Sequence, residues 1–522
     1  LKCSSVPGVR ARAGAWAASV VDIRGMANVY EVPGGFNLFL KPSEKDRFAD
    51  WREVVIDRTL VNRALSSCFE GLASLLPDAV APNVLTLCGS FAVLQAWHIC
   101  ENYGDAQPCL VACVVGVAVL LFGTLREVGG KHSRRIMNDT SFSELFKYVC
   151  GLISSVFLVV VLCYLLLERD LDTQWYCVQT AQLVMLLTHY SAFMREAGVR
   201  YVILGPTELL AGALALIAVR IFYGLSCIEV LYDHISGDAG TSVSHARVAC
   251  LSVFCITFLR IMGSLARTHS RTKTSLLLIL IMRAVGASLR MQLLEKGQTT
   301  KRDVIIDGLF MSIVTADLIV AKMAGRELHT LIVLMASIVV MPRLQILSLC
   351  LVVFYYVSVF GDLMHHMNLP LLQASQNVYC DGIFDLNHIG HKNLFRRALT
   401  LGNRLFVGVV GDKDANNYKR PPIMSAAERE AEVGGCKGVC KVISNAPCFG
   451  LTEEFIRKHR IHIVAFGQEY AERFPDPEDD PYYRVPRKMG IARPMPRTEG
   501  FSTSDLIRRI QSRPADEKKS PT

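Results

Sequence analysis

About ten apolar segments of helical length run between Ala81 and Met364, and they constrain the fold more than any other feature. An α-helix needs roughly 20 apolar residues to cross a bilayer, where backbone groups must be bonded within the helix. We therefore expect a multi-pass α-helical membrane bundle of about ten spans. Pro342 separates the last two segments, which could instead form one bent helix. The expected spans are 82–101, 108–124, 146–168, 174–194, 201–223, 245–266, 273–290, 303–324, 328–341 and 343–364.

Composition agrees with a membrane protein that carries a water-soluble part. Hydrophobic residues make up 51% of the 522 residues, and the mean hydropathy is +0.32. The 17 cysteines are scattered, and many fall in apolar segments as small buried residues do. Cys436 and Cys440 lack a CxxC partner, so we expect no zinc site. The net charge of +9 fits loops that face anionic lipid, and no nucleic-acid partner is indicated.

The start of the chain and the charges of the loops bear on topology. Leu1 suggests a fragment or a processed form, and the mixed N-terminal segment 1–53 contains no clear signal peptide. Basic residues such as Arg126 and Arg134 follow even-numbered spans, whereas acidic residues such as Glu101 follow odd-numbered ones. Because positively charged loops stay in the cytosol, we expect both termini there.

Residues 380–391, Cys-Asp-Gly-Ile-Phe-Asp-Leu-Asn-His-Ile-Gly-His, say most about chemistry. An apolar strand pattern ends there and a helical pattern follows. His388 and His391 would lie on one face at the helix start, beside free N–H groups and the positive end of the helix dipole. Gly390 removes a Cβ that would keep a nucleotide off the backbone. The segment therefore predicts a phosphate-binding site.

This segment resembles the His-x-Gly-His signature of the nucleotidyltransferase superfamily, in particular the cytidylyltransferases that make CDP-choline and CDP-ethanolamine. Residues 497–506, Arg-Thr-Glu-Gly-Phe-Ser-Thr-Ser-Asp-Leu, are similar to a second motif of that family and follow at the required spacing. The resemblance covers roughly residues 376–512 and implies a cytosolic Rossmann-like α/β domain with the nucleotide at the carboxyl ends of the strands. We expect strands at 377–380, 404–410, 439–443 and 461–466, and helices at 390–401, 425–434, 452–459 and 503–512.

The resemblance implies a role for each matching residue. The phosphate of a phospho-alcohol would attack the α-phosphate of CTP and release pyrophosphate, a reaction that depends on positioning and charge neutralisation. His388, His391, Lys419 and Arg497 would be catalytic, with Lys419 bridging the two phosphates. Ser502 and Thr503 also fit a plain helix N-cap. The CTP site would comprise Gly382, Ile383, Phe384, Asp385, His388, Gly390, His391, Lys419, Arg497, Thr498, Gly500, Ser502 and Thr503.

The same resemblance implies the cofactor, partners and location. Mg²⁺ would enter with CTP, no metal ion would be held by the protein alone, and the domain would form a homodimer. The activity would be that of a choline-phosphate cytidylyltransferase (EC 2.7.7 type) in phosphatidylcholine synthesis. We expect an integral membrane protein of the endoplasmic reticulum that contacts membrane lipids and exposes its catalytic domain to the cytosol.

The alcohol is less constrained than the nucleotide. The quaternary ammonium of choline donates no hydrogen bond, so a choline site needs aromatic faces and a nearby acid. The candidate aromatic residues are Phe449, Tyr470, Tyr482 and Tyr483, and we expect the phospho-alcohol to contact Asp385, Lys419, Phe449 and Tyr470. Choline enzymes of this family usually carry Trp after Asn-Ala-Pro, where this chain has Cys448 and then Phe449. The Arg-Thr-Glu-Gly stretch and the single catalytic domain favour phosphocholine, and phosphoethanolamine is the alternative.

Residues 54–151 resemble a second family of the same pathway, the CDP-alcohol phosphotransferases. Their signature, Asp-Gly-x2-Ala-Arg-x8-Gly-x3-Asp-x3-Asp, aligns without gaps, and Gly130 and Arg134 match it. Gly129, Lys147 and Gly151 replace the aspartates that would hold metal ions. We therefore expect a phosphotransferase-like bundle without that activity, and a chance match in a basic loop is the alternative.

Four regions follow from these patterns. They are the N-terminal segment 1–53, a transmembrane domain at 54–366, a cytidylyltransferase domain at 376–512 and a disordered tail at 513–522. The bundle would anchor the catalytic domain at the membrane where CDP-alcohols are consumed. A bifunctional enzyme that also transfers the phospho-alcohol to diacylglycerol and a non-catalytic scaffold are the two alternatives.

Overall fold

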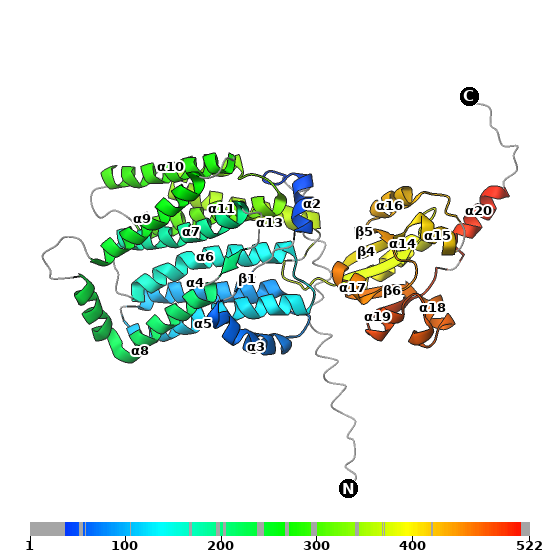
Figure 1. Cartoon of the computed structure of the whole chain (residues 1–522), viewed down its shortest axis with the longest axis horizontal. Helices are drawn as coiled ribbons and strands as arrows, with labels where there is room; N and C mark the ends of the chain where they lie inside the picture. The colour runs from blue at the N-terminus through cyan, green and yellow to red at the C-terminus, as the bar shows by residue number, and fades with distance from the viewer. Residues whose placement is uncertain are drawn as a thin grey trace, which may run out of the picture.

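The computed structural model describes residues 37–512. Shorter gaps interrupt this range at 52–55, 58, 105, 166–169, 195–198, 202–204, 237–244, 267–270, 294–299, 340–343, 368, 370, 419–420 and 499. Most of the N-terminal segment and the expected tail at 513–522 therefore lie outside the described residues. A helical bundle occupies one end of the molecule and an α/β domain the other (Figure 1), so the expected order of the two parts is confirmed.

Ten consecutive helices stand where the apolar segments predicted spans. Before them come α2 (Pro42–Asp50) and α3 (Leu60–Ser74), and a short parallel bridge joins β1 (Ile56–Asp57) to β2 (Arg200–Tyr201). The ten are α4 (Pro82–Tyr103), α5 (Pro108–Arg135), α6 (Ser141–Leu165), α7 (Leu171–Met194), α8 (Pro206–Ser236), α9 (His245–Ala266), α10 (Arg271–Leu293), α11 (Lys301–Ala324), α12 (Thr330–Val339) and α13 (Gln345–Met367).

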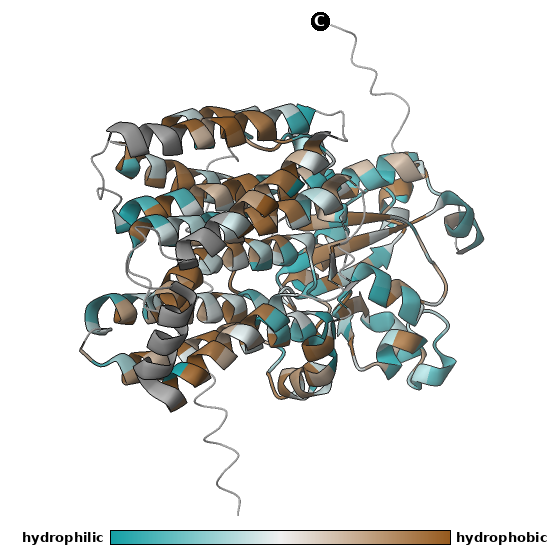
Figure 2. Ribbon diagram, turned by 60° about the vertical axis from the view of Figure 1, so that its left-hand side comes forward, coloured by the Kyte–Doolittle hydropathy of each residue, from teal (hydrophilic) through white to brown (hydrophobic). Residues whose placement is uncertain are grey.

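Five of these helices are long and apolar enough to cross a membrane, judged over the described residues: α4, α5, α6, α11 and α13. Apolar residues concentrate in the bundle and polar ones in the α/β domain, as Figure 2 shows. A membrane crossing by all ten helices stays a prediction. Helix α12 is 10 residues long, which is too short to span a bilayer by itself.

Helix α11 is the core of the bundle, and 94% of its apolar window is buried inside the protein. Asp307 and Asp317 lie on it, and both are almost fully buried. Asp307 pairs with Arg283 at 3.1 Å, and Asp317 pairs with Arg326 at 2.6 Å. A buried carboxylate is tolerated when it is paired in this way. Trp175 of α7 also donates to Asp307 at 2.8 Å, and Tyr355 of α13 donates to Asp317 at 3.1 Å, so both acids join α11 to neighbouring helices.

The α/β domain is built on a five-stranded parallel sheet in the order β5-β4-β3-β6-β7. The four expected strands are present, and β7 at the edge is an additional strand. The strands are β3 (Asn377–Gly382), β4 (Arg404–Val410), β5 (Val439–Ala446), β6 (Ile463–Gly467) and β7 (Ala492–Met495). The helices are α14 (Ile389–Leu399), α15 (Asp412–Tyr418), α16 (Ala426–Gly434), α17 (Glu453–His459), α18 (Gln468–Arg473), α19 (Arg484–Lys488) and α20 (Thr503–Gln511), with a 3₁₀ turn η2 at Pro477–Asp479.

Alternating side chains give the sheet two buried faces. Val378 and Cys380 of β3 pack on one side with residues of α14 and α16, whereas Tyr379 packs on the other side with α17 and α19. This alternation follows from the two-residue period of a strand. The chain moves outward from β3 in one direction through β4 and β5, and in the other through β6 and β7. A switch point of this kind opens a crevice at the carboxyl ends of β3 and β6.

The two parts touch at the amino ends of the strands. The Nδ1 atom of His462 accepts the Asn377 N–H at 2.9 Å, so its Nε2 carries the proton and donates to the Ile136 carbonyl at 2.8 Å. Arg460 pairs with Asp139 at 2.8 Å, and Arg404 donates to the Met367 carbonyl at 3.1 Å. Residue 136 follows α5 directly, so the α/β domain docks on the turn between α5 and α6.

Gly408 of β4 tests the packing of the sheet. A Cβ at this position would overlap the Tyr379 hydroxyl oxygen and lie 2.8 Å from the Ala446 Cβ. We expect Gly408→Ala to destabilise the domain by about 1–3 kcal/mol through overpacking. Gly434→Ala is the matched control, because a Cβ there meets Val442 at an ordinary 3.6 Å. Thermal unfolding of the full chain in detergent measures both, and equal melting temperatures for the two variants would contradict the packing described here.

Candidate active site

A cavity of about 370 Å³ opens at the carboxyl ends of β3 and β6, a volume within the range of small-molecule sites. Its walls come from the loop between β3 and α14, from the end of β6, and from the segment that leads into α20. The position is the switch point of the sheet, where open α/β folds bind their ligands.

Two helices begin at this cavity. His388 is the N-cap of α14, and its Nδ1 accepts the Gly390 N–H at 3.1 Å. Ser502 is the N-cap of α20 and accepts the Asp505 N–H at 3.1 Å. Thr503, the first residue of α20, connects the two helix starts: its Oγ1 donates to the Asp385 carbonyl at 3.2 Å and lies 3.4 Å from Nε2 of His388, the N-cap of α14. Two positive helix ends therefore face one space, which favours an anion there.

The two histidines stack on each other. The ring centroids of His388 and His391 are 3.9 Å apart with an interplanar angle of 21°. Burial lowers the pKa of His391 to about 3, and burial together with the Arg497 charge lowers the pKa of His388. Both rings are therefore neutral at pH 7. Because Nδ1 of His388 is an acceptor, its Nε2 carries the proton, and this N–H is a donor that lies 3.4 Å from the Thr503 Oγ1.

Gly390 leaves room for the His388 ring. A Cβ at Gly390 would meet the His388 ring at 2.9 Å before it reached the Phe501 carbonyl at 3.6 Å. Glycine therefore lets the His388 ring fold over the first turn of α14, where the ring can hold its Nδ1 bond to that turn. The expected approach of a nucleotide to the backbone at Gly390 stays a prediction.

Most of the expected CTP-binding residues come together around the cavity. Gly500 is close in sequence but does not line it, and Lys419 lies outside the described residues. Arg497 lines the cavity and is exposed, so its guanidinium is available to a ligand. The expected residues that do line it are Gly382, Ile383, Phe384, Asp385, His388, Gly390, His391, Arg497, Thr498, Ser502 and Thr503. Their individual roles stay predictions.

The loop between β3 and α14 holds two strained residues. Phe384 has φ 54° and Leu386 has φ 50°, a left-handed conformation that costs bulky residues about 1–3 kcal/mol each. Phe384 stays buried because its ring meets His391 and Phe395, with centroids 5.2 Å away in both cases. A Cβ at Gly382 would meet the same ring at 3.0 Å. The surrounding contacts therefore force the loop into this shape.

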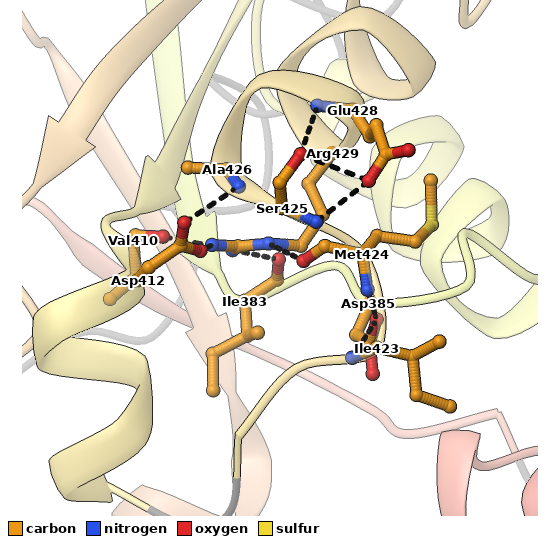
Figure 3. A network of polar contacts seen from close by, with 10 residues as sticks. All are labelled: Ile383, Asp385, Val410, Asp412, Ile423, Met424, Ser425, Ala426, Glu428 and Arg429. Atoms are coloured by element: carbon orange, nitrogen blue, oxygen red, sulfur yellow. Dashed lines mark hydrogen bonds and ion pairs between the residues drawn. The ribbon is translucent and has the colours of Figure 1, made fainter.

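Arg429 on α16 is the main support of this loop (Figure 3). Its guanidinium is fully buried and donates to the carbonyls of Ile383 at 2.7 Å, Val410 at 2.8 Å and Met424 at 3.2 Å. It also pairs with Asp412 at 2.6 Å. Arg429 thus joins the ends of β3 and β4 to the start of α16, a role that no sequence motif predicted.

Asp385 belongs to the same support. Its Oδ1 accepts the backbone N–H groups of Ile423 at 3.1 Å and Met424 at 3.0 Å. The side chain is almost fully buried, and the residue lines the cavity. Asp385 therefore fixes the position of the segment before α16. Its expected contact with a phospho-alcohol stays a prediction.

A second corner of the cavity combines an acid with aromatic rings. Asp381, at the end of β3, accepts a hydrogen bond from the Tyr483 hydroxyl at 2.7 Å. Burial raises the pKa of Asp381 to about 6, an effect that the Tyr483 bond opposes. Tyr470 meets Tyr483 edge to face at 5.3 Å, and Phe466 lies 4.8 Å from Tyr483 between ring centroids. Glu469 completes this corner of the lining.

Only some of the aromatic residues that were expected to contact the alcohol line this corner of the cavity. Tyr470 lines the cavity as expected. Phe449 is 52% exposed and stacks on Tyr482 with centroids 5.6 Å apart, outside the lining. Tyr483, another candidate aromatic, lines the cavity as well, whereas Tyr482 does not. Asp381 and Glu469 were not assigned to the alcohol from the sequence. The strand-end position of Asp381 was the signal that could have identified it, because ligands bind at the carboxyl ends of parallel strands.

The site offers no ready set of metal ligands. Within the described part of the chain, no group of three or more His, Cys, Asp or Glu side chains is placed to hold a metal ion. Of the carboxylates in the cavity lining, Asp385 accepts backbone N–H groups of the segment before α16, and Asp381 accepts the Tyr483 hydroxyl. These residues therefore do not form a metal shell, and an ion that enters with CTP would depend on the nucleotide phosphates.

Comparison with known proteins agrees with this geometry. Residues 379–509 match the Cytidylyltransferase-like family. The ethanolamine-phosphate cytidylyltransferase of Dictyostelium discoideum is 36% identical over 135 residues, which is 26% of this chain and 37% of that protein. The choline-phosphate cytidylyltransferase A of Rattus norvegicus is 40% identical over 135 residues, 26% of this chain and 36% of that protein.

The chain thus spans about a third of the length of these curated relatives. An Arabidopsis thaliana ethanolamine-phosphate cytidylyltransferase is similar as well, with 38% identity over 137 residues, 26% of this chain and 32% of that protein. The α/β domain is cytidylyltransferase-like, and its relatives act on both alcohols by name. These matches do not distinguish choline from ethanolamine.

Arg429 provides the test of the loop support. Arg429→Ala would leave two buried carbonyls without a donor and would release the strained loop. We expect a loss of about 2–4 kcal/mol in stability and at least a tenfold rise in KM for CTP. The control is Arg457→Ala, because Arg457 forms an exposed pair with Glu453 that is worth less than about 1 kcal/mol. Thermal unfolding and CTP kinetics measure both variants, and a stable Arg429→Ala enzyme with unchanged KM would refute this role.

Proposed function

We propose that this chain is a membrane-anchored cytidylyltransferase that converts CTP and phosphocholine into CDP-choline and pyrophosphate. One observation carries the proposal. The amino ends of α14 and α20, with His388 and Arg497, face the same cavity as Asp381 and its aromatic neighbours. A strongly anionic ligand and a cationic group are therefore accommodated side by side. The two named kinds of relative, choline- and ethanolamine-phosphate cytidylyltransferases, support the reaction class.

The reaction would be a displacement at phosphorus. A phosphate oxygen of phosphocholine forms a new bond to the α-phosphorus of CTP, and the bond from that phosphorus to the bridging oxygen of the leaving pyrophosphate breaks. The helix ends and Arg497 would bind the triphosphate, and the Nε2–H of His388 would donate to a phosphoryl oxygen as charge builds up. Mg²⁺ carried by CTP would neutralise charge on the phosphates. Lys419 would bridge the two substrates, as the family resemblance implies.

The corner formed by Asp381 would receive the alcohol. A quaternary ammonium has no N–H to donate, so aromatic faces and a carboxylate are the groups that can hold it. Phe466, Tyr470 and Tyr483 supply the faces beside Asp381. Phosphoethanolamine is the alternative, because its ammonium could donate to both Asp381 and Glu469.

The helical half would act as the anchor and not as a second enzyme. Gly129, Lys147 and Gly151 stand where the phosphotransferase signature has aspartates. Lys147 pairs with Glu144 at 2.6 Å, so the charge of this neighbouring carboxylate is neutralised by a lysine. The proposed location is a membrane such as that of the endoplasmic reticulum, with the α/β domain in the cytosol.

Release of pyrophosphate from CTP by the full chain in detergent tests the function. We expect turnover that requires a phospho-alcohol and is higher with phosphocholine than with phosphoethanolamine. His388→Ala should lower kcat by about 10²–10³-fold, since it removes a donor aimed at developing charge. Preference for phosphoethanolamine would change the substrate and keep the reaction. No release with either alcohol would reject the enzyme assignment.

The raised pKa of Asp381 predicts a pH dependence. The ionised carboxylate is the form that attracts an ammonium, so the kcat/KM for the phospho-alcohol should fall as the pH drops through about 6. Asp381→Asn should raise KM about 10–100-fold at pH 7.5 and should remove this dependence. The substrate phosphate titrates in the same range, so the difference between the two enzymes is the quantity to compare. Glu472→Gln on α18 is the control, and parallel profiles for Asp381→Asn and the parent enzyme would contradict the assignment.

A further inference from the structure

A second and larger cavity, of about 610 Å³, lies in the helical half. It is bounded by α5, α6, the turn between them and the start of α8, and Arg460 of the α/β domain reaches into its lining. We call it the interdomain cavity. It lies against the turn on which the α/β domain docks, whereas the catalytic cavity opens at the opposite ends of the strands.

The lining of the interdomain cavity carries charges of both signs. Lys147 pairs with Glu144 at 2.6 Å, and Arg460 pairs with Asp139 at 2.8 Å. Arg126 also lines the cavity and makes no hydrogen bond or ion pair with any residue that the structure describes. The same is true of Arg134, eight residues further along α5. Two guanidinium groups are thus left for a ligand.

Two glycines keep the space beside these guanidinium groups open. The Nη1 atom of Arg126 is 3.6 Å from the point where a Cβ on Gly151 would stand. The Nη1 atom of Arg134 is 4.0 Å from the corresponding point on Gly130, which itself lines the cavity. Any larger side chain at these positions would enter the space that the guanidinium groups border.

The same cavity offers groups that suit a cation. Glu127 of α5 lines it and has no hydrogen bond or ion pair to the part of the chain that is described. The rings of Trp51 and Tyr201 also line it. Trp51 already attracts one ammonium group, since the Nζ atom of Lys322 lies 5.4 Å from the centre of its ring. Aromatic rings with a nearby carboxylate are what an ammonium ligand requires.

We propose that the interdomain cavity binds a zwitterionic phosphate ester that carries an ammonium group. Arg126 and Arg134 hold the phosphate, and Glu127 with the aromatic rings holds the ammonium. Guanidinium groups suit phosphate oxygens because their N–H donors form a planar fork. The site requires no metal ion, and the inference stands whether or not the α/β domain is catalytic.

Two sources carry this chemistry, the headgroup of a phospholipid and a soluble phospho-amino-alcohol. The helix α3 borders the cavity through Asn62 and exposes Leu65, Leu72 and Leu75. An exposed apolar stripe of this kind suits contact with lipid. Arg460 belongs to the α/β domain, so a ligand in the cavity would also touch the docking contact between the two parts.

Calorimetric titration of the full chain in a maltoside detergent tests the proposal. The probes are dihexanoylphosphatidylcholine below its micelle concentration and phosphocholine. Every protein carries Asp381→Asn and Arg497→Ala, which weaken binding at the alcohol corner and at the phosphate end of the catalytic cavity. We expect saturable binding of at least one probe. Arg126→Ala should weaken it about tenfold or more, and Gly130→Leu should abolish it by filling the cavity. Arg63→Ala, an exposed arginine on α3, should leave it unchanged.

The outcomes separate the sources. Binding of the short lipid alone identifies a lipid headgroup, and binding of phosphocholine identifies a soluble ligand. Arg126→Lys should restore part of the affinity, because it returns the positive charge. Only variants whose melting temperature equals that of the parent are compared, which excludes misfolding as the cause of lost binding. The proposal is wrong if neither probe binds saturably, or if Arg126→Ala and Gly130→Leu bind within twofold of the parent. Equal affinity for dihexanoylphosphatidic acid, which lacks the ammonium, would reject the zwitterionic ligand.

Discussion

The shape of the catalytic cavity depends on one buried guanidinium. Arg429 makes three bonds to backbone carbonyls and one to Asp412, and these partners come from segments far apart in the chain. A buried cation is costly unless every donor is used. Here its bonds hold the loop that contains the left-handed Phe384. That loop places Phe384 against His391 and leads to His388, so the histidine end of the cavity rests on a residue that lies outside the cavity lining.

Much of the architecture was predictable from pattern. The ten apolar segments correspond to α4–α13, and the four expected strands and helices of the α/β domain lie within a few residues of their positions. Apolar periodicity is strong in these elements because each has a buried face. The elements that were missed, β7, α15, α18 and α19, are short and largely polar, and nothing local marks them. Tertiary contacts determine such segments.

The candidate site was predictable to the extent that its residues sit in motifs. His388, His391, Arg497 and Thr503 lie in two contiguous stretches, and the structure brings both stretches to one cavity. Asp381 lies within the first stretch, but only its burial and the Tyr483 contact distinguish it from an ordinary strand end. Arg429 acts through contacts that no local pattern encodes, because the carbonyls of Ile383 and Val410 to which it donates lie 46 and 19 residues away in the sequence.

The docking of the two parts through His462 and Arg460 makes the parallel sheet a spacer. The amino ends of the strands rest on the bundle, and all strands point the same way, so the catalytic cavity faces away from it (Figure 1). The six residues of β3 set the two apart by roughly 20 Å at about 3.3 Å per residue. The length of a strand therefore determines how far the cavity stands from the helical bundle. In the proposed membrane-anchored arrangement, a nucleotide would reach the cavity from bulk solvent without approaching lipid.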